Sequence, residues 1–413
     1  MAGKHCLYEQ SRRAVTCNLL KQLSIDSEDI DRIVKAKHDI ERGMASGFSQ
    51  SLIMDDGNPI NFNIKDELVG IEKDIFFLEN IKHGLDTDKF IDYLSSFHQV
   101  SKAQFHAELS QLEAMLQRML RTGSIDLFIT DWDGTMKTYC CNYRTSMQPA
   151  YSAVIVALFA ERLTKLDMDA LTFGGSWGRE WLVDGRFVVF KDNFQQNGET
   201  MLKQLTDALT ALMRGSPEFS RFFLIGSGFQ RKVDRVTIGV QNVNGDIANE
   251  TVARFLNALN DELRELDPDR THFCVHNDKL DVEIILKGRE NNPWNKADGV
   301  RFLLSEVRQA TPRGSVWICG DTMSDLPMVD FALSLTDRAY ATFINPSDEL
   351  TAQIRSRLQP DRLCIAGCPE VLHAALLKSV IHEKELANLV ANVQPSNTAT
   401  AATAIIDAGR PAE

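Results

Sequence analysis

Long hydrophobic runs are missing from this 413-residue sequence. No uninterrupted apolar stretch approaches the roughly 18 residues that a membrane-spanning helix needs, and the N-terminus shows no hydrophobic signal-like segment. These absences predict a cytoplasmic protein. Positive charge is also in short supply, because 45 Lys and Arg face 57 Asp and Glu and leave a net charge of −12. Nucleic acids and anionic membranes bind to cationic faces, so neither is expected as a partner.

The cysteines show no paired spacing. The eight cysteines include an adjacent pair, Cys140 and Cys141, which shows no disulfide pattern. Cys364 and Cys368 have no second pair of ligands with which to form a zinc site. We therefore expect free thiols, as in a reducing compartment.

What is present is typical of a globular protein with two or three domains. Hydrophobic residues make up 44% of the chain and charged residues 25%. Residues 1–120 contain apolar residues at helical spacing and no recognisable catalytic motif, which predicts an all-α N-terminal domain. This domain would serve either for self-association into a homo-oligomer or as a scaffold. The helical patterns lie at 8–23, 30–44, 68–81 and 90–119. The tail, 386–413, is rich in Ala, Thr, Pro and Asn and is predicted to be disordered.

Two short acidic motifs directly follow apolar runs. The run at 125–130 ends in Asp131-Trp132-Asp133-Gly134-Thr135, and a later run ends in Gly320-Asp321-Thr322-Met323-Ser324-Asp325. If both runs are strands of an α/β sheet, the motifs lie at the edge where such sheets bind ligands. Either motif alone could be an ordinary turn or helix cap. Together, and with Lys296 upstream of the second motif, they predict one site.

The clustered carboxylates indicate phosphoryl transfer. Asp131, Asp133, Asp321 and Asp325 would repel one another unless a hard cation held them, and oxygen ligands suit Mg²⁺. Asp131 is then the nucleophile that forms an aspartyl-phosphate, while Asp133 protonates the leaving alkoxide and later deprotonates the attacking water. Lys296, which precedes a predicted helix, offsets the negative charge of the nucleophile and the phosphate.

The segment 181–292 is too long for a loop in a compact domain and should form a small α/β cap. Its patterns predict a hairpin at 181–190, helices at 198–213 and 248–266, and strands at 221–229, 233–240, 271–275 and 279–286. Placed over the carboxylates, this cap would exclude water and select the leaving group.

The junction of two predicted cap strands, Gly226 to Arg235, is unusually polar and cationic. One interpretation is a surface hairpin with solvated charges. The other is that Arg231 and Lys232 face the core and bind a polyol or a phosphate, while Glu283 of the last cap strand accepts hydrogen bonds from sugar hydroxyls.

The two acidic motifs and the lysine resemble those of the haloacid dehalogenase superfamily of phosphotransferases. The resemblance implies a Rossmann-like core at 121–180 and 293–385, interrupted by the cap. The superfamily's second motif places a Ser or Thr against the phosphoryl oxygens, but Gly174 stands where a Ser is common. Ser176 or Thr172 could take its place. Alternatively, backbone N–H groups of this glycine-rich turn, including that of Gly175, could bind the phosphate.

A narrower resemblance is to the trehalose-6-phosphate phosphatases of the nematode-type branch. It is carried by the strings FITDWDGTMK, GSWGREW, GSGFQRKVDR and ICGDTMSDLPMV. It implies trehalose 6-phosphate as the substrate, a helical N-terminal domain, and cap contacts from Gln230, Arg231, Lys232 and Glu283. Gln230 departs from the wider family, in which many members carry a Glu. Two alternatives stay open: a phosphatase of another sugar phosphate, and a non-catalytic sugar-phosphate sensor.

Overall fold

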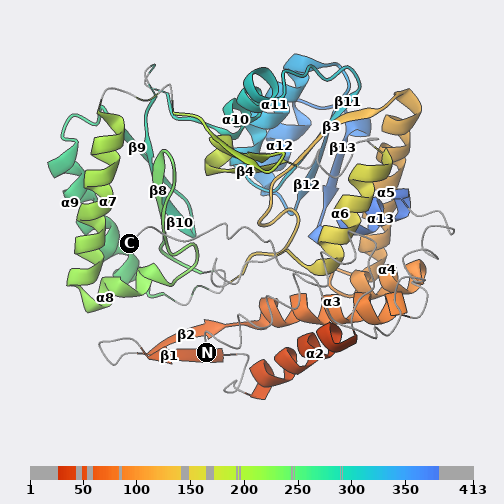
Figure 1. Cartoon of the computed structure of the whole chain (residues 1–413), viewed down its shortest axis with the longest axis horizontal. Helices are drawn as coiled ribbons and strands as arrows, with labels where there is room; N and C mark the ends of the chain where they lie inside the picture. Colours follow the sequence, from red (N-terminus) through yellow and green to blue (C-terminus); the bar gives the residue numbers. More distant parts are fainter. Residues whose placement is uncertain are drawn as a thin grey trace.

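The computed structural model describes residues 27–42, 49–53, 59–82, 86–140, 148–163, 172–191, 194, 197–242, 245, 247–288, 290 and 292–380. The helical pattern at 8–23 and the predicted disordered tail lie outside these residues. Figure 1 shows N-terminal helices along one end of the molecule, a core built on a parallel sheet, and a cap (green) beside that core.

The N-terminal part is helical, as predicted, and also contains a β-hairpin. Its helices are α2 (Ser27–Arg42), α3 (Lys65–Lys82), α4 (Thr87–Ser95) and α5 (Lys102–Thr122). The pattern at 90–119 forms two helices because Ser101 caps a new one, its side chain accepting a hydrogen bond from the backbone of Gln104 at 3.0 Å. The strands β1 (Ser49–Ile53) and β2 (Pro59–Asn63) pair antiparallel where the sequence predicted only a break between helices.

The core sheet brings the two motif-bearing runs together as neighbours. Its order is β13-β12-β11-β3 and all four strands are parallel. The strands are β3 (Ile125–Thr130), β11 (Ser315–Gly320), β12 (Ala339–Ile344) and β13 (Leu363–Ala366). Because β3 and β11 run side by side, the acidic motifs that follow them begin at the same edge of the sheet.

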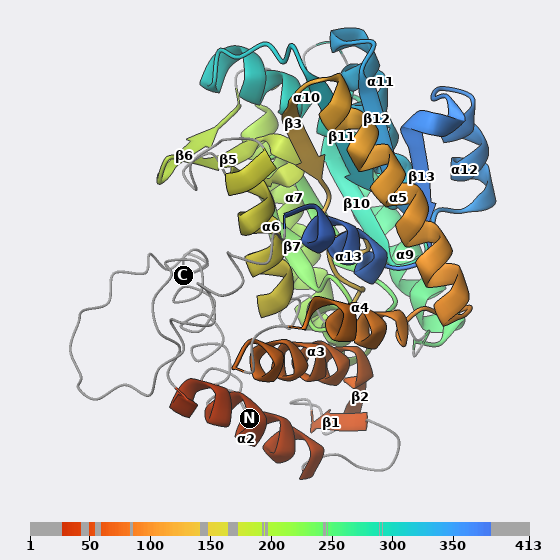
Figure 2. The same cartoon turned by 90° about the vertical axis from the view of Figure 1, so that its right-hand side faces the viewer.

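Alternating side chains of the buried strands face two helical layers. Val316 and Ile318 of β11 pack with α10 (Lys296–Phe302), α11 (Leu326–Leu335) and α12 (Asp348–Arg355). The helix α10 continues as a wider π-type turn, Leu303–Val307. Trp317 and Cys319 pack with α5, α6 (Ala150–Leu163) and α13 (Pro369–Val380). Figure 2 shows α5 and α13 lying over the sheet on this side.

The N-terminal helices share this second layer rather than forming a core of their own. One hydrophobic cluster runs from Ile30 of α2 through α3, α4 and α5 to α6 and α13. A buried ion pair crosses the same contact, with Lys73 Nζ of α3 lying 2.5 Å from Glu370 Oε1 of α13. The predicted boundary at residue 120 therefore falls near the end of α5, a helix that packs on the core sheet.

The cap has an antiparallel sheet of order β7-β8-β10-β9, with helices on one face. Its strands are β7 (Phe229–Arg231), β8 (Arg235–Gly239), β9 (Phe273–Asn277) and β10 (Asp281–Leu286), and its helices are α7 (Gly198–Gly215), α8 (Pro217–Ser220) and α9 (Asn249–Leu266). The strand predicted at 221–229 is wrong over most of its length. Residues Arg221–Phe223 form a 3₁₀ turn, and Gly226 and Gly228, both at positive φ, delay the strand until Phe229.

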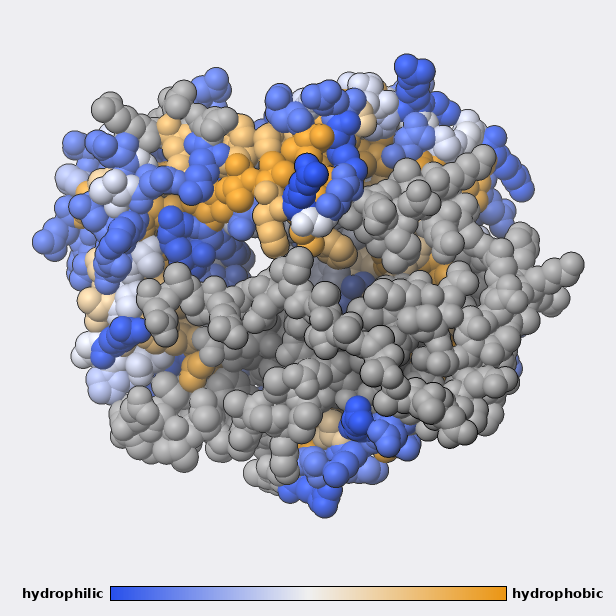
Figure 3. All heavy atoms as spheres, in the orientation of Figure 1, coloured by the Kyte–Doolittle hydropathy of each residue, from blue (hydrophilic) through white to orange (hydrophobic). Residues whose placement is uncertain are grey.

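A small three-stranded antiparallel sheet lies between core and cap in the sequence. It consists of β4 (Phe173–Gly175), β5 (Glu180–Val183) and β6 (Arg186–Val189), and β5 and β6 form the hairpin predicted at 181–190. Phe173, Phe187 and Val189 are exposed on it, and Figure 3 shows apolar surface where β4 lies in Figure 1.

Two further predictions concern the described residues as a whole. Five of the cysteines in the described part of the chain, Cys140, Cys274, Cys319, Cys364 and Cys368, are free thiols, as expected. No helix within that part is long and apolar enough to cross a membrane.

Candidate active site

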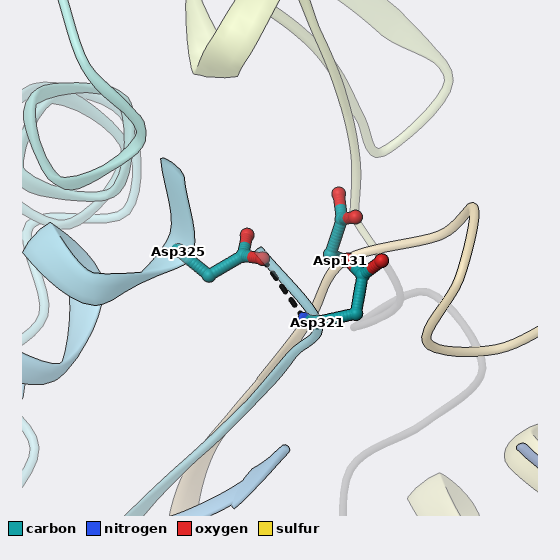
Figure 4. A group of neighbouring side chains, drawn as sticks. All are labelled: Asp131, Asp321 and Asp325. Atoms are coloured by element: carbon teal, nitrogen blue, oxygen red, sulfur yellow. Dashed lines mark hydrogen bonds between the residues drawn. The ribbon is translucent and has the colours of Figure 1, made fainter. Parts of the chain in front are cut away.

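Three of the four predicted carboxylates converge on one point (Figure 4). Asp131 follows β3, Asp321 follows β11, and Asp325 lies in the 3₁₀ turn Met323–Asp325. One ligand oxygen from each side chain lies within 4.8 Å of the others. Hard oxygen donors at such spacing fit a divalent cation of the Mg²⁺ or Ca²⁺ type.

Backbone hydrogen bonds hold this arrangement in place. The Asp131 N–H donates to Cys319 O at 3.0 Å, so the backbone of Asp131 is still hydrogen-bonded to β11. The Asp325 carboxylate accepts hydrogen bonds from the N–H groups of Asp321 and Thr322, both at 3.0 Å. Gly134 adopts a positive φ of 84°, and a Cβ at this position would collide with the Asp321 carboxylate.

Lys296 bridges two of the carboxylates from the start of α10. Its Nζ lies 2.9 Å from Asp131 Oδ1 and 2.5 Å from Asp325 Oδ1. The helix begins there because Asn295 and Asp298 form a capping box. Burial opposes the charge of Lys296, but Asp325 and Asp131 raise its pKa above the usual value, so the ammonium stays protonated.

The carboxylates carry more negative charge than Lys296 can offset. Burial, together with the charges of Asp325 and Asp131, raises the pKa of Asp321 to about 8. Burial also raises the pKa of Asp131, although Lys296 opposes this rise. The three carboxylates therefore fit a divalent cation, which would compensate the negative charge that burial makes unfavourable.

The carboxylate of Asp133 lies outside this group, which corrects the prediction that it is a fourth side-chain ligand. It points to Lys137, whose Nζ lies 2.9 Å from Asp133 Oδ1. The reason is local: the chain turns after Asp131, and Asp133 forms a bridge with Lys137 inside that turn. Its predicted role as acid and base is a separate matter, because that role needs contact with the leaving group rather than with the metal.

Two residues of the same turn contact Asp321 and were missed in the sequence. The Tyr139 hydroxyl donates to Asp321 Oδ2 at 2.7 Å, and the Thr135 hydroxyl donates to Asp321 Oδ1 at 3.5 Å. Their nearness to the first motif was the only available clue, since a Tyr or Thr after a turn is usually exposed and solvated.

The glycine-rich turn has a strained backbone. Ser176 and Trp177 have φ values of 49° and 54°, and Gly178 follows at 79°. The Ser176 hydroxyl donates to Glu180 and accepts from the Val233 N–H of the cap at 3.2 Å. Such positive φ values outside glycine cost free energy and persist only where the surroundings hold them.

The same turn packs against α10, which carries Lys296. A Cβ on Gly299 would lie 2.5 Å from Gly178 Cα. Thr172, the other candidate for the second motif, accepts a hydrogen bond from Arg308 at 3.1 Å. The Ser176 hydroxyl is thus engaged by Glu180 and Val233, and the Thr172 hydroxyl by Arg308, and the phosphate-binding role of Ser176 and Gly175 stays a prediction.

The cap brings Lys232 and Glu283 together. Lys232 Nζ lies 3.6 Å from Glu283 Oε1, and Arg235 and Thr237 also contact this carboxylate, at 3.4 and 2.9 Å. Burial tends to raise the pKa of Glu283, but the charges of Lys232 and Arg235 outweigh it and hold that pKa below its usual value. Gln230 pairs with Thr237, which pairs with Glu283, so these three residues form one row across the sheet.

Arg231 does not join this row, which corrects the expectation that it faces the same way as Lys232. It pairs with Val236, whose side chain is buried on the helix-covered face. Arg231 borders a surface hollow of about 480 Å³ that is lined also by Lys191, Glu199, Thr200, Lys203, Thr206 and Asp207.

Comparisons with known proteins agree with this site. Family models match residues 128–172 and 166–372 as "Trehalose-6-phosphate phosphatase, C-terminal" and residues 4–109 as "Trehalose-6-phosphate phosphatase N-terminal helical bundle domain". A trehalose-phosphatase of Caenorhabditis briggsae is 32% identical, over 92% of this chain and 96% of that protein. The trehalose-phosphatase of Brugia malayi is 30% identical, over 90% and 84%.

Among solved structures, the C-terminal domain of the Candida albicans trehalose-6-phosphate phosphatase aligns at 14% identity and a TM-score of 0.43, covering 65% of this chain and 96% of that one. So low a score adds no weight, and the assignment rests on the sequence matches. Those matches span both the N-terminal helices and the α/β part that contains Asp131, Lys296 and Asp321. The chain belongs to the trehalose-6-phosphate phosphatase family.

Proposed function

We propose that this protein hydrolyses trehalose 6-phosphate to trehalose and inorganic phosphate. The observation that carries the proposal is the position of Lys296, which bridges Asp131 and Asp325 beside Asp321 in a chain of this family. A largely buried ammonium held against a carboxylate at the end of a strand suits the attack of that carboxylate on a phosphate ester.

The reaction proceeds in two displacements. A carboxylate oxygen of Asp131 attacks phosphorus, the bond between phosphorus and the sugar oxygen breaks, and Asp133 gives its proton to that oxygen. Asp133 then takes a proton from water, the water oxygen attacks phosphorus, and the bond to Asp131 breaks. Phosphate leaves and both side chains return to their first state.

Lys296 holds Asp131 in place throughout and offsets the charge that the phosphate brings. The carboxylates of Asp131, Asp321 and Asp325 would hold the divalent cation, for which we propose Mg²⁺, and the cation would supply positive charge against the phosphate oxygens. Ser176 and the N–H of Gly175 are the proposed further contacts to the phosphate.

The cap supplies the proposed sugar contacts. Lys232, Glu283 and Gln230 present cationic, anionic and amide groups from the helix-free side of the cap sheet. Hydroxyl groups of a disaccharide can accept from the first and donate to the second, so this row suits a polyol. A phosphatase of another sugar phosphate would use the same core, and a sensor would bind without turnover. Cytoplasmic location and self-association through the N-terminal helices remain predictions.

Phosphate release from a panel of sugar phosphates tests the proposal. Trehalose 6-phosphate should give the highest kcat/KM, and Asp131→Asn should abolish turnover while calorimetry shows that the sugar phosphate still binds. Retained turnover in Asp131→Asn would rule out the aspartyl-phosphate. Binding without release by the unaltered protein would favour the sensor, and a higher kcat/KM for another member of the panel would replace the substrate.

A further inference from the structure

The loop that follows the nucleophile lies between the carboxylates and the N-terminal helices. On one side, Thr135 is fully buried and its hydroxyl contacts Asp321. On the other side, Met136 is 1% exposed and packs into the hydrophobic cluster that the N-terminal helices share with α6 and α13. The backbone is closed on itself, since the N–H groups of Met136 and Lys137 both donate to Trp132 O, at 2.9 and 3.3 Å.

Lys137 is the side chain that this loop buries next to Asp133. Only 5% of the Lys137 side chain is exposed, against 48% for Asp133. Its Nζ donates to Asp133 Oδ1 at 2.9 Å and to Thr138 O at 2.6 Å. Two directed hydrogen bonds from a buried ammonium fix its position, so the Asp133 carboxylate is held by a group that cannot itself move freely.

The acidic first turn of α3 carries charges that act on this loop. Burial raises the pKa of Asp66, and the ammonium groups of Lys65, Lys73 and Lys137 partly oppose that rise. Burial likewise raises the pKa of Cys140 to about 12, with Lys137 opposing the rise and Glu67 adding to it. Asp66 and Glu67 are therefore near enough to the loop for their charges to act on it.

The helix α3 is itself fixed to the core. Lys73 pairs with Glu370 of α13, and Asp74 Oδ1 accepts a hydrogen bond from the N–H of Tyr151 at the start of α6, at 3.4 Å. The acidic first turn of α3 thus belongs to a helix that two polar contacts hold against the core.

We infer that Lys137 is a positioning residue that aims the Asp133 carboxylate, and that the N-terminal helices, through Met136 and the acidic first turn of α3, hold Lys137 in place. The inference rests on the proposed function, because it matters only if Asp133 transfers protons. It gives the N-terminal helices a part in catalysis, because without them the loop would lose the packing around Met136.

A double-mutant cycle on Asp133→Asn and Lys137→Met tests the inference, with trehalose 6-phosphate as substrate. Lys137→Met should lower kcat by roughly 10- to 100-fold, part of what general acid–base catalysis contributes, with KM changed by less than about 3-fold. If Lys137 acts through Asp133, the double variant should be no slower than Asp133→Asn alone, because the second change has nothing left to misplace. Lys137→Arg, which keeps the charge, should recover most of the loss.

The leaving group offers a second readout. p-Nitrophenolate leaves without a proton, so Lys137→Met should still release the first equivalent of it fast and then slow down, giving a burst in stopped-flow traces. A loss of global structure would slow the first turnover as well. Lys137→Gln replaces Lys137→Met if the latter fails to fold.

The contribution of α3 is tested with a matched pair of first-turn substitutions. Asp66→Asn should lower kcat for trehalose 6-phosphate by a few-fold, while Asp88→Asn, an exposed acid in the first turn of α4, should leave it unchanged. An Asp66→Asn variant as active as Asp88→Asn would contradict the proposed role of α3 in holding Lys137.

Two outcomes separate this inference from the proposed function. A slow Asp133→Asn beside an unimpaired Lys137→Met, or losses that multiply in the double variant, would overturn the role of Lys137 and leave the phosphatase mechanism standing. A fully active Asp133→Asn would refute the acid and base assignment, and the inference with it.

Discussion

Removing Lys73 should destabilise the whole protein, because its partner Glu370 would be left as an unpaired buried charge. The two side chains are only 5% and 3% exposed, and Nζ and Oε1 lie 2.5 Å apart. Breaking a buried pair from one side typically costs about 3–5 kcal/mol, against the 5–15 kcal/mol that holds an ordinary domain folded. Lys73→Met keeps the stem, and its sulfur can replace the ammonium that lies 4.2 Å over the Phe97 ring.

The assay is urea-induced unfolding followed by circular dichroism, with the free energy of unfolding extrapolated to water. The double variant Lys73→Met with Glu370→Leu should recover about half of the loss or more, because no charge is then left without its partner. The matched control is Lys102→Met, which breaks an exposed pair with Asp92 at 2.9 Å and should cost less than about 1 kcal/mol.

Equal costs for Lys73→Met and Lys102→Met would refute the reasoning, and so would losses that simply add in the double variant. Either result would mean that water reaches the pair in solution. A single cooperative transition that moves as a whole would further show that α3 and α13 unfold together, as one shared hydrophobic cluster requires.

Three other predictions concern metal, substrate and pH. Exhaustive chelation should abolish phosphate release and Mg²⁺ restore it, whereas Ca²⁺, which demands more ligands, should inhibit; full activity after chelation would contradict the carboxylate site. Lys232→Ala or Glu283→Ala should lower kcat/KM for trehalose 6-phosphate by roughly 10- to 100-fold and should lower kcat/KM for p-nitrophenyl phosphate much less. The control Lys279→Ala, at an exposed residue, should change neither value. Equal losses on both substrates would mean that Lys232 and Glu283 have a purely structural role. Burial lowers the pKa of His373 to about 4, so the unfolded chain binds the extra proton first and stability should fall as pH drops from about 6.5 toward 4, by up to roughly 3 kcal/mol. His373→Gln should flatten this slope in urea titrations at each pH, and an unchanged slope would contradict it.

The strands and functional residues of the catalytic core were predictable because short, local sequence patterns indicate both. Apolar runs of strand length ended in Asp131 and in Asp321, and parallel strands in α/β proteins place such ends at one edge. Lys296 was found by its place before a helical pattern, and the structure shows it as the first residue of α10. In each case a short stretch of sequence fixes both the secondary structure and the position of the functional group within it.

No local sequence pattern predicted that the N-terminal helices share a hydrophobic cluster with the core. Amphipathic spacing shows that a helix buries one face but does not name the partner of that face. Lys73 and Glu370 are 297 positions apart, and each by itself looks like an ordinary surface charge. The partnership is visible only when α3 and α13 are seen to pack on the same side of the sheet.

Arg231 shows a different failure, one that the sequence could have prevented. Successive side chains of a strand point to opposite faces, so Gln230 and Arg231 cannot both face the sugar if β7 contains both. The error came from placing the strand at 221–229, which left both residues in a hairpin turn where alternation does not apply. Gly226 and Gly228, two residues apart and both at positive φ, indicate that the chain turns there. The strand can therefore begin only after them. Once the strand is moved to Phe229, alternation alone assigns Gln230 to the row of Glu283 and sends Arg231 to the helix-covered face.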